Sequence, residues 1–229
     1  AEAAARQAAA RARAIAPRDA STLLAGGLVR LLFDRDAPAA EAEMHRALEA
    51  APGELPSRMA LALALQAQGR FPESVVLLQS AALVDPDAGV LFLQGRGRGA
   101  AGRGAEAIPA FERALASSPR LGAARQGLAE CLAATGRTRE AARALGGPGT
   151  AILEDQWRRL CRASGAPAVD RVRPCVLAGE SDRALGALRE GERSGSPFLV
   201  FVAEDPLFAP LSARADFRSR LDEAGPRRE

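Results

Sequence analysis

The chain alternates Ala- and Leu-rich segments with short breaks at glycine or proline. Within these segments the apolar residues recur three or four positions apart, which is the spacing of one face of an α-helix. Two clear examples are "AIPAFERALASSP", which begins at residue 107, and "GLAECLAATG", which begins at residue 127. The pattern therefore predicts a series of consecutive helices.

The breaks between the predicted helices recur about every 34 residues. Four prolines, each ending an Ala/Leu-rich segment, are spaced 35, 34 and 33 residues apart: Pro17, Pro52, Pro86 and Pro119. Three glycines, each followed by arginine, are spaced 33 and 34 residues apart: Gly69, Gly102 and Gly136. Because glycine adopts the left-handed conformation that closes a helix, each Gly-Arg predicts a tight turn between antiparallel helices.

Beyond each predicted turn, a small residue is followed four positions later by a larger apolar one. The pairs are Ser74 and Leu78, Ala107 and Phe111, and Ala141 and Leu145. Residues four apart share one helix face, so this face is predicted to pack against the partner helix.

The repeated unit resembles the tetratricopeptide repeat. The best match has Gly95 as the small residue of the first helix and Gly102 at the turn, then Ala107, Phe111, Ala114 and Pro119. The resemblance implies an all-α fold, namely a right-handed α-solenoid of tandem helix-turn-helix repeats. It also implies a non-catalytic protein-interaction scaffold or adaptor.

The repeats predict two parts of the chain. The solenoid covers 1–147, with a partial repeat at 3–17 and units at about 20–52, 55–86, 88–119 and 121–147. The first full unit has no glycine turn, and the last has no closing proline. The sequence "GGPGT" at 146–150 ends the period, and 151–229 is expected to hold additional helices and a cap. The truncated first repeat favours a fragment or a processed form.

The tail at 197–224 resembles the closing segment that follows such repeats in bacterial multidomain regulators. The matching residues are Asp205-Pro206, Pro210-Leu211 and Phe217. The resemblance implies a winged-helix, cyclase or kinase domain elsewhere in a larger protein, with a membrane anchor upstream as a possible context. An extracytoplasmic location is favoured slightly, and a cytoplasmic one remains the alternative.

Composition narrows the classes of partner and site. The net charge is +3 and the arginines are spread along the chain, so no nucleic-acid surface is expected. No apolar stretch reaches the ~20 residues that span a bilayer, so no membrane insertion is expected. With His45 as the only histidine, Cys131, Cys161 and Cys175 are interpreted as buried or free thiols, not as a metal site. No cofactor is predicted.

One stretch resembles a nucleotide-binding turn, because 97–102 fits the pattern G-x-G-x-x-G. The segments that follow it have helical periodicity, whereas a dinucleotide-binding unit needs strands. A phosphate loop would need Lys-Ser/Thr where this chain has Arg103-Gly104. His45 is expected to be a partly exposed helical residue, and no group of residues predicts catalysis.

Binding is the remaining function. In stacked helix pairs the first helices line a concave groove, which a partner protein or peptide could occupy. The residues predicted to face it are Thr22, Val29, Met59, Leu63, Gln66, Phe92, Arg96, Gln126 and Glu130. The chain's own C-terminal segment could equally cover this surface. A sensory or regulatory region of a larger signalling protein or transcription regulator, and a structural accessory subunit, remain alternative functions.

Overall fold

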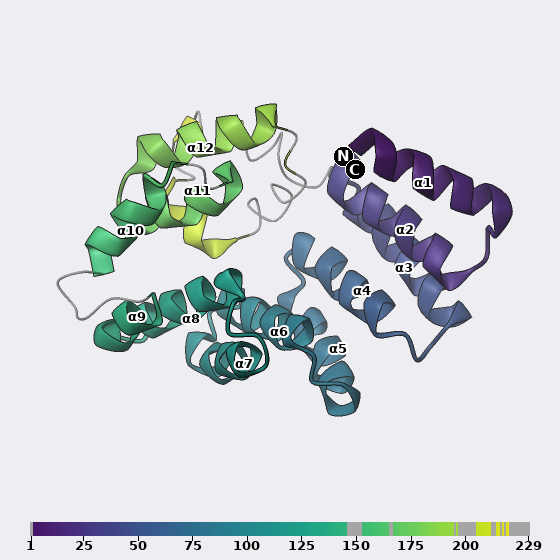
Figure 1. Cartoon of the computed structure of the whole chain (residues 1–229), viewed down its shortest axis with the longest axis horizontal. Coiled ribbons are helices and arrows are strands. Elements are labelled where there is room, and N and C mark those ends of the chain that lie inside the picture. Colours follow the sequence, from purple (N-terminus) through teal and green to yellow (C-terminus); the bar gives the residue numbers. More distant parts are fainter. Residues whose placement is uncertain are drawn as a thin grey trace.

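The computed structural model describes residues 2–145, 153–164, 167–194, 196, 205–211, 214, 215, 217 and 219. Every regular element within these ranges is a helix (Figure 1). None of the helices in this part of the chain is long and apolar enough to cross a membrane.

The helices follow one another as pairs that stack in series. After α1 (Glu2–Ile15) come α2 (Ala20–Val29) with α3 (Ala37–Ala50), α4 (Leu55–Ala67) with α5 (Phe71–Val84), α6 (Ala88–Ala100) with α7 (Gly104–Ser117), and α8 (Gly122–Ala134) with α9 (Thr138–Ala144). Then α10 (Leu153–Cys161) precedes a last pair, α11 (Ala168–Leu177) and α12 (Ser181–Arg193), and a 3₁₀ helix, Pro206–Leu211. In Figure 1 the pairs form a curve with α4, α6 and α8 on its inner side and α5 and α7 on its outer side. The predicted all-α solenoid is confirmed.

Left-handed residues close the first helix of each pair. Gly69, Gly102, Gly136 and Gly179 have φ values of 73°, 76°, 79° and 72°. In the first pair Arg35 takes this place with φ 56°, directly after a π-helical turn, Arg30–Asp34. The unit without a glycine therefore keeps the same turn, although the left-handed conformation costs a non-glycine residue about 1–2 kcal/mol.

The predicted packing positions are buried. Ser74, Ala107 and Ala141 are fully buried, as are Leu78 and Phe111, while Leu145 is half-buried. Counted from the turn residue, the same two positions in the other pairs are also buried: Ala40 and Met44 after Arg35, and Ala184 and Leu188 after Gly179. The pair α11–α12 thus repeats the packing pattern of the solenoid.

The glycine-rich stretch of α6 is a helix and not a phosphate-binding loop. A Cβ atom on Gly95 would lie 2.8 Å from the Phe111 ring, and one on Gly97 would lie 3.0 Å from both Gln66 and Val75. A Cβ atom on Gly99 would lie 3.3 Å from the Cys131 sulfur. The missing side chains therefore let α4, α5, α7 and α8 approach α6 closely, and this close approach offsets the ~1 kcal/mol that each helical glycine costs relative to alanine.

The C-terminal helices have a core of their own. It contains residues of α10, α11, α12 and the tail: Cys161, Val172, Cys175, Ala184, Leu185, Ala187, Leu188, Phe208, Leu211 and Phe217. Trp157 of α10 instead joins the cluster of α6 to α9. Phe217, which the tail resemblance singles out, is fully buried.

Candidate functional site

Three predicted groove residues form an apolar surface on α4 and α6. Met59, Leu63 and Phe92 are each half-buried, and they pack against the buried cluster that contains Ala62 and Leu93. The Phe92 ring lies 6.2 Å from that of Phe111, measured between centroids. The exposed parts of the three side chains leave apolar surface that a partner could cover.

Gln66 lies below this surface and is only 2% exposed. Its Nε2 donates to Ser74 Oγ at 2.8 Å and to the Leu93 carbonyl at 3.0 Å. Its Oε1 accepts from Arg96 Nε at 2.7 Å. Gln66 therefore joins α4 to α5 and α6 and positions Arg96, because a buried amide stabilises the fold only when its polar atoms are paired.

Arg96 is positioned next to a second arginine, Arg173 of α11. Burial, and secondarily the positive charge of Arg173, lower the pKa of Arg96 to about 10. At neutral pH the guanidinium is still charged, so the positive charges of Arg96 and Arg173 lie close enough to interact.

Arg173 links the groove to the C-terminal tail. Its Nε donates to Glu130 Oε1 at 3.0 Å, and its other nitrogens form ion pairs with Glu130 and Asp205. Burial opposes the charge on Arg173, but the carboxylate of Glu130 outweighs it and raises the pKa of Arg173. The chain's own α11 and tail therefore hold Glu130, a predicted partner-binding residue.

The nine predicted groove residues lie in different environments in the structure. Gln66, Arg96 and Glu130 belong to the polar contacts just described, and Met59, Leu63 and Phe92 to the adjoining apolar surface. Gln126 of α8 and Val29 of α2 are half-buried, whereas Thr22 is buried at the start of α2, where its backbone N–H donates to Asp19. Partner binding by these residues stays a prediction.

Sequence reasoning did not predict the ion pairs of Arg173 with Glu130 and Asp205, although it named Asp205 as part of the closing segment. A signal for Arg173 exists in the repeat register, because Arg173 precedes Gly179 by six residues, as Arg96 precedes Gly102 and Glu130 precedes Gly136. The three side chains thus share one position on successive inner helices. Asp205 lies in the tail and has no such register.

The cysteine prediction is wrong for two of the three residues. Cys161 of α10 and Cys175 of α11 form a disulfide bond. Only Cys131 is a free thiol, and its burial raises its pKa to about 11. The pairing depends on how α10 and α11 pack, which their spacing in the sequence does not reveal.

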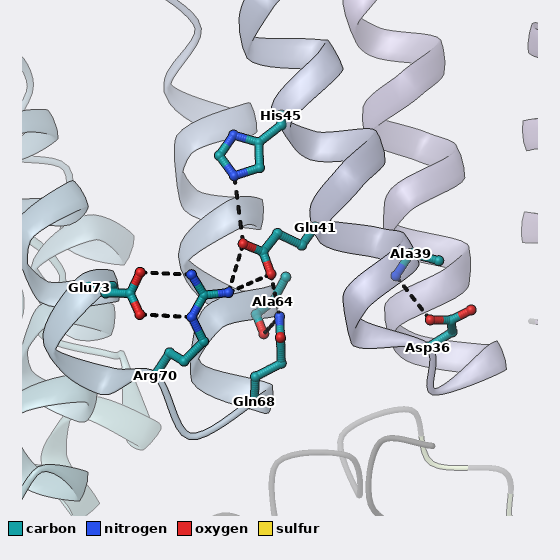
Figure 2. Close-up of polar contacts among 8 residues, drawn as sticks. All are labelled: Asp36, Ala39, Glu41, His45, Ala64, Gln68, Arg70 and Glu73. Atoms are coloured by element: carbon teal, nitrogen blue, oxygen red, sulfur yellow. Dashed lines mark hydrogen bonds and ion pairs between the residues drawn. The ribbon is translucent and has the colours of Figure 1, made fainter. Parts of the chain in front are cut away.

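A second polar cluster joins the first two pairs (Figure 2). Glu41 of α3 accepts from Arg70 Nη1 at 2.7 and 2.8 Å and from Gln68 Nε2 at 2.7 Å. His45 Nε2 lies 3.6 Å from Glu41, and its side chain is 57% exposed, as expected for a surface histidine. Arg70 also pairs with Glu73, which lowers the pKa of Glu73. These contacts attach α3 to the α4–α5 turn, so the cluster is structural.

Two comparisons agree with this architecture. Residues 100–160 match the family model described as "Tetratricopeptide repeat". Among solved structures, the chain is similar to one titled "Functional Characterization of Pseudomonas Aeruginosa pilF", with a TM-score of 0.58 and 18% sequence identity. The similarity covers 84% of this chain and 85% of that chain. No curated protein sequence matches the chain significantly.

The comparisons support the α-solenoid, and the family match supports a tetratricopeptide repeat at residues 100–160. Such repeats generally mediate protein–protein interactions, and they are typically non-catalytic. At this level of identity the similarity to PilF supports the fold alone.

Proposed function

We propose that the chain is a protein-interaction adaptor that binds a segment of a partner protein along the inner side of α4 and α6. The observation that carries the proposal is the half-buried apolar surface of Met59, Leu63 and Phe92 on these neighbouring inner helices. Apolar side chains that are only partly covered within one chain are typical anchors for a partner segment.

Polar contacts within the chain mark where this apolar surface ends. Gln66 binds Arg96, and Arg173 binds Glu130, so the chain's own residues occupy these polar positions on α6 and α8. The surface proposed for the partner is therefore the apolar one of Met59, Leu63 and Phe92.

The test is affinity capture with the full chain, comparing wild type with the double variant Phe92→Ala/Arg96→Ala. Glu112→Ala/Arg113→Ala, which changes exposed residues on the outer side of α7, is the matched control. We expect the groove variant to lose specific partners that the control keeps. Retention of every partner by a groove variant that melts like the wild type would contradict the proposal.

A second candidate is the regulatory region of a larger bacterial signalling protein. The ion pairs of Arg173 favour it, because they connect a groove residue to the tail. A partner carboxylate that competes for Arg173 would release Asp205, so binding would change the tail. Hydrogen exchange at 205–211 tests this: faster exchange in the bound protein supports regulation, and unchanged exchange supports a simple adaptor.

The disulfide supports an extracytoplasmic location within this proposal. Structural disulfides persist in oxidising compartments and are rare in the cytosol. The remaining thiol, Cys131, is buried and has a raised pKa, so it is protected from oxidation in the same compartment.

A further inference from the structure

The outer face of α5 exposes three large apolar side chains. Val76, Leu83 and Val84 have relative exposures of 67%, 88% and 81%. They are seven and eight positions apart, so they lie along one face of the helix over about 10 Å. Leu83 and Val84 adjoin at the C-terminal end of α5, and Val76 lies two turns earlier, with the exposed polar residues Gln79 and Ser80 between them. We call Val76, Leu83 and Val84 the α5 patch.

The repeat itself does not require these side chains. Counted from the turn residue, the positions of Val76, Leu83 and Val84 can be compared with those of the other pairs. The equivalents are exposed too, but they are small, polar or proline: Ala42, Pro109, Arg143 and Gly186 for Val76; Glu49, Ala116 and Arg193 for Leu83; and Ala50, Ser117 and Ser194 for Val84. Since the same fold forms with those residues, the apolar patch of α5 is not explained by packing within the chain.

The patch is separate from the groove. In Figure 1, α5 lies on the outer side of the curve, whereas α4 and α6 face the inner side. The buried face of α5 carries Val75, Leu78 and Ala81, which pack inside the solenoid. The exposed face therefore remains available when the groove is filled.

Charge distinguishes the two ends of the patch. Asp85 and Asp87 are exposed directly after Leu83 and Val84. At the other end of the patch, near Val76, Glu73 is paired with Arg70. The end of the patch that carries Leu83 and Val84 is therefore acidic, although the net charge of the chain is +3. An anionic bilayer would meet these carboxylates where the apolar side chains would have to insert.

We propose that the outer face of α5 binds a short amphipathic helix of a partner protein. This helix presents large apolar side chains at i, i+3 or i+4, and i+7, and it carries Arg or Lys at the end that lies against Asp85 and Asp87. The ridge of Val76, Leu83 and Val84 matches such a helix in spacing, and the acidic end fixes its direction.

The test uses a displayed library of helical peptides of about 18 residues, long enough for five turns. It is selected on the immobilised full chain, and the enriched peptides are synthesised. We expect apolar residues at helical spacing with a terminal Arg or Lys. The triple variant Val76→Gln/Leu83→Gln/Val84→Gln should weaken these peptides at least tenfold, and Asp85→Asn should weaken them about threefold, with a smaller effect at high salt.

Two controls keep the result interpretable. The triple variant should melt like the wild type, because it changes only exposed side chains. The groove variant Phe92→Ala/Arg96→Ala should keep full affinity for the α5 peptides, so a failure of the proposed groove and a failure of this inference are separable.

Four outcomes would overturn the inference. The first is equal binding of the enriched peptides to the wild type and the triple variant. The second is enrichment of acidic or uncharged peptides, and the third is a selection that enriches no peptide. The fourth is another occupant of the patch, shown either by self-association in sedimentation that the triple variant loses or by binding to phosphatidylcholine vesicles that depends on the same residues.

Discussion

Two junctions between helices of the solenoid, one N-terminal and one central, are filled by opposite chemistry. At the N-terminal junction of α1, α2 and α3, Glu43 is 8% exposed in its side chain and pairs with Arg13 and Arg30. At the central junction of α6, α7 and α8, the Phe111 ring is buried against Gly95 and Gly127. One junction contains ion pairs and the other an aromatic ring.

Glycine provides the space in both junctions. A Cβ atom on Gly26 would lie 2.3 Å from Glu43 Oε2 and 2.6 Å from Arg13 Nη2. A Cβ atom on Gly127 would lie 2.5 Å from the Phe111 ring. The comparison teaches that the repeat sets the position of the glycine. The side chain that packs against this glycine determines how much the junction contributes to stability. We expect the central junction to be the more stable, since a buried ion pair gains little over apolar packing.

The largest effect is expected when the central junction loses its ring. Phe111→Ala should lower the free energy of unfolding by about 3–5 kcal/mol, because it removes a fully buried aromatic side chain between three helices. Urea denaturation followed by circular dichroism measures the loss. The exposed neighbour Glu112→Ala is the control, and a loss no larger than that control would contradict the assigned role of Phe111.

Filling the glycine space should cost less. Gly127→Ala is expected to destabilise by about 1–3 kcal/mol, because the new methyl group overlaps the Phe111 ring. The double variant Gly127→Ala/Phe111→Leu should be more stable than the two separate losses predict, since leucine leaves room for the methyl group. Strict additivity in the same denaturation assay would count against direct contact.

The N-terminal junction can be converted towards the central type. Glu43→Gln should cost about 1–3 kcal/mol because it leaves two arginines beside a neutral amide. The triple variant Arg13→Leu/Arg30→Leu/Glu43→Leu removes both arginines together with the carboxylate and places at 43 the residue type of Leu77, its equivalent in the next pair, so it should recover most of that loss. Glu49→Gln, on the exposed face of the same helix, is the control. An equal loss for Glu43→Gln and the triple variant would show that the junction requires the charges themselves.

Backbone strain at the turns should have a similar but smaller effect. Gly102→Ala is expected to cost about 1 kcal/mol, because alanine is strained at a φ of 76° although no atom lies within 4 Å of its Cβ. Gly104→Ala, two residues later and inside α7, meets its nearest atoms at an ordinary 3.9 Å and should be neutral or stabilising. If both variants behave alike in thermal melts, the turn does not select glycine.

The smallest effect concerns the thiol of the central junction. Burial raises the pKa of Cys131 to about 11, so the folded state keeps its proton longer than the unfolded state. This contribution to stability is present below pH about 9 and is lost as the pH rises through about 11. At pH 8 the native protein should react with iodoacetamide at least tenfold more slowly than the urea-unfolded protein. Comparable rates would show that the junction is open to water.

The sequence allowed the helices, the glycine turns and the small and large packing residues to be predicted, because each has a local physical cause at a fixed spacing. Arg35 was not predicted as a left-handed turn, since arginine does not favour that conformation. Gln66 was expected to face the groove because it lies on the first helix of its repeat, yet its buried hydrogen bonds depend on Ser74 and Leu93 of other helices. The Cys161–Cys175 bond likewise depends on tertiary packing alone.

The burial of Trp157 gives the molecule an internal optical probe. The chain has one tryptophan and no tyrosine, so its ultraviolet emission comes from a single place. Trp157 lies where α10 packs against the cluster of α6 to α9, and it is 3% exposed. Its emission therefore reports the separation of α10 from these helices, whereas circular dichroism reports all helices at once. If the ion-paired end frays first, helical signal falls before the emission shifts to the red, and the lag between the two curves measures how far unfolding spreads from repeat to repeat.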